Sequence, residues 1–88
     1  MKIEFKRSFA KDLRKIRDAH LHRQVKETLE LIERVQSLQE VSDIKKLKGG
    51  DRYYRIRIGD YRLGLILDTD TVILVRFLHR KDLYRYFP

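Results

Sequence analysis

The hydrophobic and polar positions in the first half of the chain follow a strand period and then a helical one. Residues 2–6 alternate Lys, Ile, Glu, Phe and Lys, which predicts a half-buried strand. Ser8 stands where a helix N-cap is expected. The apolar residues of the first helix are Phe9, Leu13 and Ile16, and those of a second helix, over roughly residues 20–39, are Leu21, Val25, Leu29, Ile32, Val35 and Leu38. We expect these two amphipathic helices to form a hairpin that packs on a sheet.

The second half of the chain has the pattern of an antiparallel sheet. Residues 44–48 lie between Ser-Asp and Gly-Gly pairs, and we interpret them as a turn or short helix that leads into a loop. Three segments rich in β-branched and aromatic residues follow, at 53–58, 61–67 and 72–78, separated by short turns. They predict an antiparallel meander. The order βααβββ indicates a single α+β domain over residues 1–88, with the helical hairpin on one face of a mainly antiparallel sheet.

Length and composition exclude several classes of protein. A chain of 88 residues is long enough for one core but not for two. Its longest apolar runs are far shorter than the ~18 residues of a membrane span, and its N-terminus lacks the apolar stretch of a secretory signal. The chain has no cysteine, which removes disulfides, thiolate zinc sites and cysteine nucleophiles. We therefore expect a cytoplasmic protein with no membrane partner.

The charge of the chain favours an anionic partner. Lys and Arg number 21 against 13 acidic residues, which gives a net charge of +8, and most of this excess lies in residues 45–88. A small, strongly basic domain typically binds a polyanion, and nucleic acid is the first candidate. The alternative is a positively charged surface that only keeps the protein soluble.

The turn at residues 59–60 sets the register of the first predicted β-hairpin. Glycine comes first in this turn, which is typical of type II′ geometry. Such a turn pairs Arg57 with Arg62 and Arg55 with Gly64. Because successive side chains of a strand face opposite ways, the three arginines share the face away from the helices. Like charges directly opposite each other destabilise a strand pair by ~0.2–1 kcal/mol.

Three arginines beside a glycine have the pattern of an anion site. Gly64 would leave a shallow place in the strand where another molecule can approach, and phosphate is the anion we expect there. The alternative is that the arginines extend into solvent or pair with acidic residues such as Asp51, Asp60 and Asp82. A slip of one residue in the hairpin would separate Arg57 from Arg62, so the prediction depends on the turn.

The C-terminal run of residues 79–88 interleaves basic and aromatic side chains. In proteins that bind single-stranded RNA, cations hold phosphates while rings stack on exposed bases, and each stacked base contributes ~1–3 kcal/mol. The same residues can instead pack the chain end onto the core. We expect Leu83 and Phe87 to be structural and Tyr84 to be functional. His79 is a further candidate, as an acid or base near neutral pH.

The element order and three local motifs resemble the RelE/ParE superfamily of bacterial and archaeal toxins, and its RelE branch in particular. The motifs are Phe-Ala-Lys-Asp-Leu at 9–13, Tyr-Arg-Ile-Arg-Ile-Gly-Asp-Tyr-Arg at 54–62 and His-Arg-Lys-Asp-Leu-Tyr at 79–84. The resemblance covers essentially the whole chain. It implies a RelE-like fold and the toxin of a type II toxin-antitoxin system, with a RelB-like antitoxin as its partner.

The resemblance also implies an activity, that of an mRNA interferase. Such a toxin is a metal-independent endoribonuclease that cuts messenger RNA in the ribosomal A site and needs no cofactor. The 2′-hydroxyl of the substrate attacks the adjacent phosphate and leaves a 2′,3′-cyclic phosphate and a 5′-hydroxyl. Consistent with this, no spacing of His, Asp or Glu in the chain suggests a metal site.

Individual roles follow from the resemblance by position. Arg55 and Arg57 match basic strand residues implicated in binding RNA and in deprotonating the 2′-hydroxyl, and Arg62 matches the arginine that contacts the scissile phosphate. Arg80 matches the arginine that assists the leaving group, and Tyr84 matches the tyrosine that stacks on a base. The expected catalytic set is Arg57, Arg62, Arg80 and Tyr84, and the expected RNA-binding set is Arg55, Lys46, Lys48, His79, Lys81 and Arg85.

One departure from the family pattern leaves the proton transfers open. Lysine often stands in the family where this chain has Arg55 and Arg57. Arginine, unlike lysine, is effectively always protonated in proteins. Either the arginines act only electrostatically, or His79 or Tyr84 shares the proton transfers. Two other functions also stay open, namely a ParE-like inhibitor of DNA gyrase and a non-catalytic RNA-binding relative.

Overall fold

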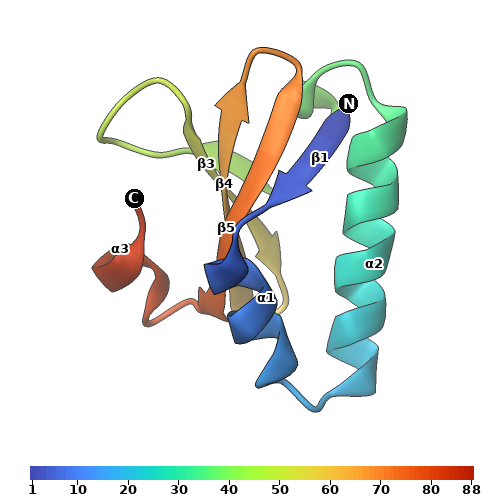
Figure 1. Cartoon of the computed structure of the whole chain (residues 1–88), viewed down its shortest axis with the longest axis vertical. Helices are drawn as coiled ribbons and strands as arrows, with labels where there is room; N and C mark the ends of the chain where they lie inside the picture. Colours follow the sequence, from blue (N-terminus) through green and yellow to red (C-terminus); the bar gives the residue numbers. More distant parts are fainter.

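The chain forms one five-stranded sheet with helices against it. A computed structural model describes all residues from 1 to 88. The elements, shown in Figure 1, are β1 (Lys2–Phe5), α1 (Arg7–Arg14), α2 (Ala19–Arg34), the 3-10 helix η1 (Leu38–Glu40), β2 (Ile44–Lys46), β3 (Tyr53–Ile58), β4 (Tyr61–Asp68), β5 (Thr71–His79) and α3 (Leu83–Tyr86). The strand order is β1-β5-β4-β3-β2, with β1 parallel to β5 and every other pair antiparallel. The predicted α+β class and the three-stranded meander are confirmed.

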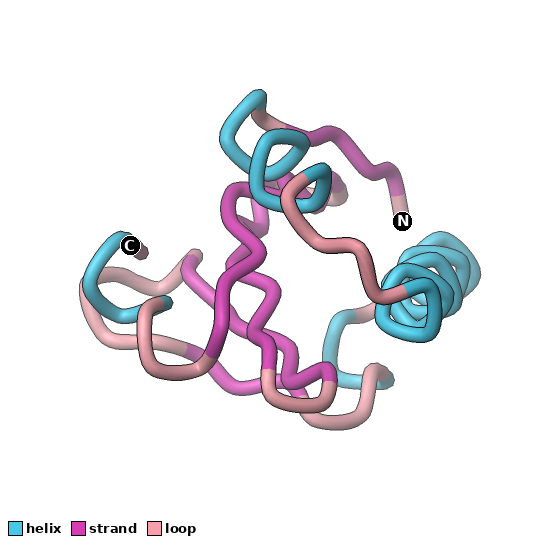
Figure 2. The backbone as a smooth tube through the Cα atoms, turned by 90° about the horizontal axis from the view of Figure 1, so that it is seen from below, coloured by secondary structure: helices cyan, strands magenta, loops and turns pink.

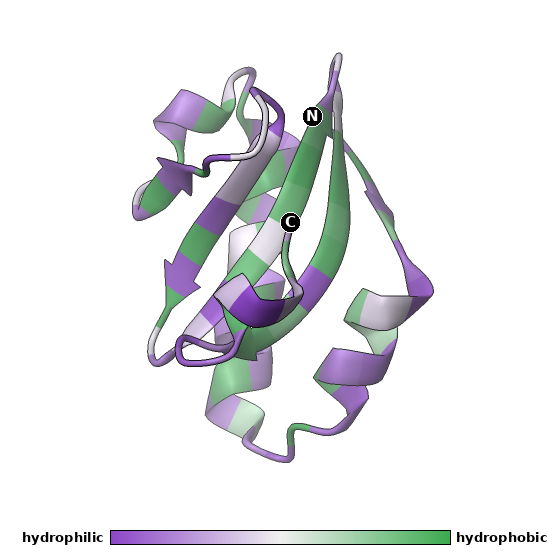
Figure 3. Ribbon diagram, turned by 90° about the vertical axis from the view of Figure 1, so that its left-hand side faces the viewer, coloured by the Kyte–Doolittle hydropathy of each residue, from purple (hydrophilic) through white to green (hydrophobic).

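The two faces of the sheet carry separate apolar clusters. Helices α1 and α2 contribute Phe9, Val25 and Ile32 to the main cluster of 13 buried residues, where they meet strand residues such as Leu63 and Phe77. Helix α3 and the chain end lie on the other side of the sheet (Figure 2), across the apolar middle of the central strands (Figure 3). The buried residues of this second cluster are Leu47, Leu83 and Phe87. We refer to this side as the α3 face.

A buried carboxylate joins α1 to β5. Asp12 is only 6% exposed. Its Oδ2 accepts hydrogen bonds from Arg76 Nε at 2.8 Å and from the backbone N–H of Phe77 at 2.9 Å, while Oδ1 accepts from Arg76 Nη2 at 3.1 Å. The hydrogen bond to Asp12 raises the pKa of Arg76, against the smaller effect of burial. This bidentate contact is the one ion pair of the structure.

Two predicted helix boundaries are wrong. Ser8 does not cap α1, because the helix begins at Arg7 after an extended Lys6, two residues earlier than predicted. Ser8 Oγ donates to the carbonyl of Val75 at 2.6 Å instead. The second helix ends well before residue 39, because Val35 adopts an extended backbone conformation. Ser37 then caps the separate turn η1. None of the helices combines the length and apolar character that a membrane crossing requires.

Residues 44–46 form a strand, which corrects the predicted turn or short helix. Strand β2 pairs with β3, with Lys45 opposite Arg55 and Lys46 opposite Tyr54. Strand β2 has three residues, and two of them are lysines. A short, charged strand is common at the edge of a sheet. The three residues are too few to show a clear strand pattern in the sequence. The position of β2 is fixed by its backbone pairing with β3. The C-terminal segment also contains an unpredicted short helix, α3.

Candidate active site

The β3–β4 hairpin places two arginines directly opposite each other, as the turn pattern predicts. Gly59 has a φ of +59°, in the left-handed region that glycine adopts without strain. Arg57 pairs with Arg62, and Arg55 pairs with Gly64. The neighbouring isoleucines of β3 point into the main cluster, so the arginines lie on the α3 face.

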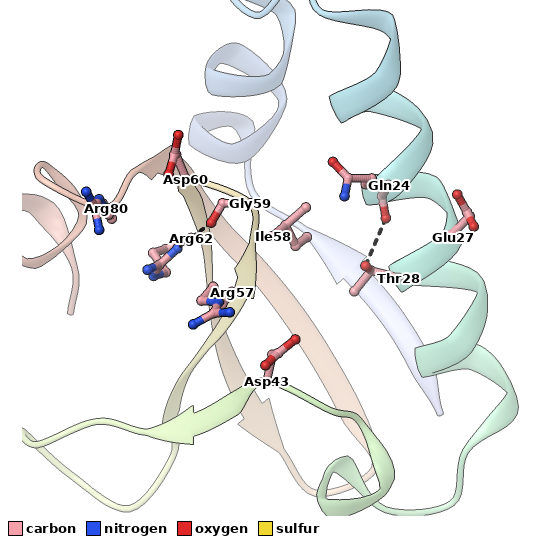
Figure 4. A pocket seen from close by; sticks show the side chains of 10 residues that line it. All are labelled: Gln24, Glu27, Thr28, Asp43, Arg57, Ile58, Gly59, Asp60, Arg62 and Arg80. Carbon is pink, nitrogen blue, oxygen red and sulfur yellow. Dashed lines mark hydrogen bonds between the residues drawn. The ribbon is translucent and has the colours of Figure 1, made fainter.

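An open cleft of about 590 Å³ lies at the turn end of this hairpin. Figure 4 shows Arg57, Arg62 and Arg80 on one side of the cleft and polar side chains of α2 on the other. Arg80 belongs to the cleft because its backbone N–H donates to the carbonyl of Asp60 at 2.8 Å, which holds the start of the C-terminal segment against the turn. The full lining is Gln24, Glu27, Thr28, Asp43, Arg57, Ile58, Gly59, Asp60, Arg62 and Arg80.

Two arginines of this region hydrogen-bond to backbone carbonyls, and none hydrogen-bonds to a carboxylate. Arg62 Nη1 donates to the carbonyls of Gly59 at 3.0 Å and Tyr61 at 2.9 Å. Arg55 Nη1 donates to the carbonyl of Asp43 at 2.8 Å, and its Nε is buried without a partner. Carbonyl groups orient a guanidinium without neutralising its charge. We call Arg55, Arg57, Arg62 and Arg80 the arginine cluster.

No acidic side chain forms an ion pair with the arginine cluster. The partners that the alternative interpretation named are Asp51, Asp60 and Asp82, and none of them takes part in the single ion pair of the structure. Three acidic residues do line the cleft, and Figure 4 shows Asp60 and Asp43 next to the arginines and Glu27 across the cleft on α2, but none of the three forms an ion pair. The arginine cluster therefore keeps its positive charge available to a ligand.

The members of the arginine cluster lie close enough to repel one another. Burial lowers the pKa of Arg62 below its ordinary value, and the positive charges of Arg55 and Arg57 lower it further. Arg80 acts in the same direction, while Tyr84 raises the pKa of Arg62. No carboxylate contributes to this shift. An anion placed among these groups would relieve the repulsion, so the geometry favours an anionic ligand.

We expect a nuclease-resistant RNA to stabilise the protein against heat. A short 2′-O-methyl oligonucleotide at 100 times its Kd contributes about 2.7 kcal/mol, enough to raise Tm by several degrees in a domain of this size. The rise should shrink with added salt, because phosphate contacts release counterions. It should be equal at pH 6 and pH 8, because arginine charge does not titrate there.

Arg62→Gln is the variant that tests this thermal shift by calorimetry. It should lose most of the rise in Tm, because it removes the most crowded guanidinium. Arg17→Gln removes the same charge from an exposed position outside the cleft and should keep the full rise. If both variants lost the same part of the rise in Tm, RNA binding would depend only on the net charge of the protein.

The remaining predicted residues lie around a second hollow and on the surface near it. Tyr84 is 59% exposed. It lines a groove of about 380 Å³, which we call the tyrosine groove, together with Lys45, Lys46, Leu47, Lys48, Phe87 and Pro88. Lys81 and Arg85 are exposed residues of the same C-terminal segment. The structure thus places two of the predicted lysines beside Tyr84.

His79 lies away from the cleft. It lines a different hollow, at the junction of α1 and the C-terminal segment. Its Nδ1 accepts a hydrogen bond from the backbone N–H of Lys81 at 3.2 Å, and its ring packs edge-on against Tyr61 at 5.6 Å. The structure does not bring His79 together with the arginine cluster. No three His, Cys, Asp or Glu side chains gather in a way that would hold a metal ion.

Lys45 is a candidate that the sequence reasoning missed. It lies opposite Arg55 across the β2–β3 pair and lines the tyrosine groove. The alternation of strand residues would have placed it on the arginine face, had residues 44–46 been identified as a strand.

The shallow place predicted at Gly64 does not exist, because the C-terminal segment fills it. The ring of Phe87 lies so close that a Cβ at Gly64 would be 2.7 Å from its Cδ2 atom. Leu83 and Phe87 are 0% and 3% exposed, which confirms their predicted structural role. The hollows near the arginines are instead the cleft at the turn end of the hairpin and the tyrosine groove.

Comparison with known proteins identifies the family. The family model described as the ParE toxin of the type II toxin-antitoxin system, parDE, matches residues 3–84. The chain is also 44% identical to Toxin RelE3 of Methanocaldococcus jannaschii over 89 residues, which is 100% of both chains. The chain belongs to the RelE/ParE family of type II toxins. The family predicted from the sequence motifs is therefore confirmed.

Solved RelE structures share the fold of this RelE/ParE toxin. One is the RelB-RelE antitoxin-toxin complex from Methanococcus jannaschii, which matches with a TM-score of 0.82 and 42% identity over 97% of this chain and 99% of that one. Another is the archaeal RelE-RelB complex from Pyrococcus horikoshii OT3, with a TM-score of 0.75 and 21% identity over 93% and 97%. At that lower identity the likeness shows the fold alone.

Proposed function

We propose that this toxin is a ribosome-dependent mRNA endoribonuclease that needs no metal ion. The observation that carries the proposal is the arginine cluster, in which four cations gather at one end of a hairpin without a carboxylate partner. A phosphodiester is an anion that such a cluster can hold through several oxygens at once. The RelE relatives support messenger RNA as the polymer that contains it.

The chemical step is an attack by the 2′-oxygen of the substrate on the adjacent phosphorus. The 2′-oxygen–phosphorus bond forms, the bond to the 5′-oxygen breaks, one proton leaves the 2′-hydroxyl and another reaches the 5′-oxygen. Negative charge grows on the nonbridging oxygens, where fixed cations stabilise the transition state more than the ground state. Arg62 serves the scissile phosphate, because it lies among the other arginines and two carbonyls orient it.

The other residues have supporting roles in this proposal. Arg80 serves the leaving 5′-oxygen, and Arg55 and Arg57 hold the neighbouring phosphates. Tyr84 is close enough to the cluster to influence the pKa of Arg62, whereas His79 lies in another hollow. The geometry therefore favours Tyr84 over His79 in any proton transfer. A ribosome that fixes the bent messenger supplies the alignment of 2′-oxygen, phosphorus and 5′-oxygen.

Primer extension on a stalled ribosome complex tests this function. Wild-type protein should produce one stop within the A-site codon, and the upstream fragment should carry a 2′,3′-cyclic phosphate. Toxin that has been stripped of metal with a chelator, and then freed of the chelator, should cleave as fast as untreated toxin at the Mg²⁺ level that keeps the ribosome intact. An uncut messenger with tight RNA binding would indicate the non-catalytic relative instead.

A ParE-like activity is the second candidate, because the matching family model is that of ParE. Such a protein would inhibit DNA gyrase and cleave no RNA. A supercoiling assay with purified gyrase separates the two functions. We expect supercoiling to continue at toxin concentrations that cut messenger completely, and inhibition without cleavage would reverse the assignment.

We infer that an acidic, RelB-like antitoxin is the protein partner. The two archaeal relatives were solved as complexes with RelB, and the basic second half of this chain offers complementary charge. A short acidic reading frame beside the gene would support this partner. Its proposed substrate, messenger RNA on a translating ribosome, places the toxin in the cytoplasm.

We expect Tyr84→Ala to lower kcat/KM for messenger cleavage by about 5- to 150-fold. This range corresponds to the ~1–3 kcal/mol that stacking contributes per base. Tyr84→Phe keeps the ring, so near-normal activity would assign Tyr84 to stacking, and a loss like that of alanine would assign it to proton transfer. Tyr86→Ala is the matched control, because Tyr86 is 55% exposed in the same helix but lies over Arg76 at 5.3 Å. It should change cleavage by less than about twofold.

A further inference from the structure

We propose that the packing of the Phe87 ring against the backbone of Gly64 positions Tyr84 for the reaction. Gly64 and Phe87 are then positioning residues, and we call Gly64 the socket and the Phe87 ring the plug. The inference rests on the proposed function only in that Tyr84 is the group being positioned. In this proposal, Gly64 in the middle of β4 leaves space for the ring of Phe87, and the ring holds the end of the chain in place.

The contact itself is closer than an ordinary side chain allows. A Cβ at Gly64 would lie 2.7, 2.9 and 3.0 Å from three ring atoms of Phe87. The edge of Tyr53 closes one side, with the two ring centroids 5.8 Å apart at an interplanar angle of 87°. With Leu47 and Leu83, Phe87 forms the buried part of the second apolar cluster. The ring is therefore held in a socket whose floor is the glycine backbone.

The backbone of β4 does not itself require glycine at position 64. The residue has no positive φ, unlike Gly59 at the turn. The β4–β5 pairing has a bulge between Gly64 and Leu65, but its extra residue is Val75 of β5, so the bulge does not require glycine in β4. Glycine within a strand weakens it and often marks a close approach by another group. Here the close approach is made by Phe87 of the same chain, so the glycine provides the space for the ring.

Tyr84 has no anchor of its own. Its side chain is exposed and takes part in no hydrogen bond. The helix that carries it, α3, has four residues and no side-chain cap, and a single turn is not stable in isolation. The backbone N–H of Phe87 donates to the carbonyl of Leu83 at 2.8 Å. The plug therefore fixes the end of the turn on which Tyr84 lies.

The socket also lies next to the proposed chemistry. Gly64 pairs with Arg55 and follows Arg62 by two residues on the same strand face. Seating the ring at this point sets where Tyr84 lies relative to the arginine cluster. A displacement of about 1 Å in a positioning group can lower a rate by roughly 100-fold, so a small shift of the plug is enough to matter.

A compensating pair of substitutions tests the proposal. Gly64→Ala should push the ring out, lower kcat by about 10- to 100-fold with KM changed less, and speed hydrogen exchange at the backbone N–H of Phe87 at least about tenfold. Phe87→Leu is smaller and leaves room for the added methyl group. The double variant Gly64→Ala/Phe87→Leu should therefore be more active than Gly64→Ala and regain slow exchange. The proposal would be overturned if the losses of kcat in the two single variants added up in the double variant. It would also be overturned if hydrogen exchange at the backbone N–H of Phe87 were the same in Gly64→Ala as in the wild type.

A second cycle asks whether the effect passes through Tyr84. In a Tyr84→Ala background, Gly64→Ala should lower cleavage by less than about twofold, and an undiminished loss there would also overturn the proposal. If Gly64→Ala does not fold, Phe87→Ala takes its place in the same cycle. Ile32→Val is the control, because it weakens packing in the main cluster, which lies on the other side of the sheet from the C-terminal segment. It should leave both the cleavage rate and hydrogen exchange at Phe87 unchanged. A wild-type protein that cleaves nothing would contradict the proposed function, while the exchange data would still decide whether Phe87 fixes the segment.

Discussion

Replacing Arg62 and Arg80 together by alanine should lower the rate of messenger cleavage by about 10,000-fold while the protein stays folded. Each well-aimed group that stabilises charge in a transition state contributes about 100- to 1000-fold, and the two arginines serve different oxygens in the proposed reaction. Neither takes part in an ion pair or in the two apolar clusters. Their removal also relieves repulsion within the arginine cluster, so the fold should not lose stability.

The measurement is single-turnover cleavage on stalled ribosomes, with circular dichroism and urea unfolding as checks on the fold. Arg17→Ala/Arg23→Ala is the matched control, because it removes the same charge from two exposed arginines outside the cleft. It should slow cleavage only through weaker association at low salt. If both double variants lose cleavage equally, or if Arg62→Ala/Arg80→Ala cuts like wild type, the site assignment is wrong.

Asp12→Ala should lower the free energy of unfolding by about 3 kcal/mol, the low end of the range for breaking a buried ion pair. The low end applies because the side chain of Arg76 is 25% exposed and keeps part of its hydration. The substitution also removes the acceptor of the buried Phe77 N–H. In a domain whose total stability is of the order of 5–15 kcal/mol, this loss is a large fraction.

Urea unfolding at neutral pH measures this effect. Asp12→Asn should lose less, because a side-chain oxygen can still accept from the Phe77 N–H. Asp68→Ala removes an exposed carboxylate with no side-chain hydrogen bond and should change stability by less than about 0.5 kcal/mol. Similar losses for Asp12→Ala and Asp68→Ala would show that the contact between α1 and β5 is not what holds the helix.

Features set by local backbone chemistry were predictable from the sequence. Glycine at position 59 can adopt a positive φ, and that one conformational requirement fixed the turn, the register and the pairing of Arg57 with Arg62. The strand period of residues 53–58 then placed the arginines on the face away from α1 and α2. The positions of Arg55, Arg57 and Arg62 thus followed from a two-residue turn and the alternation of strand residues. Arg80 joins them through the contact of its backbone N–H with the turn.

Features set by contacts between distant segments were not predictable in the same way. Nothing near Gly64 in the sequence shows that Phe87 will cover it, and the predicted hollow was wrong for that reason. His79 continues the strand pattern of β5, but only the packing of Tyr61 shows that its ring lies away from the cleft. Strand β2 depends on pairing with β3, and so Lys45 was missed.

The parallel pairing of β1 with β5 bears on when the toxin can become active during its own synthesis. Lys2 lies opposite Thr71 and Phe5 opposite Leu74. Strand β1, which is translated first, can therefore join the sheet only after β5, which is translated last, has been made. Contacts so distant along the chain form slowly, because loop closure must come first. A nascent chain still inside the exit tunnel therefore lacks a finished scaffold for its arginines. The arginine cluster gains its complete scaffold only once β5 has been synthesised and has paired with β4 and β1.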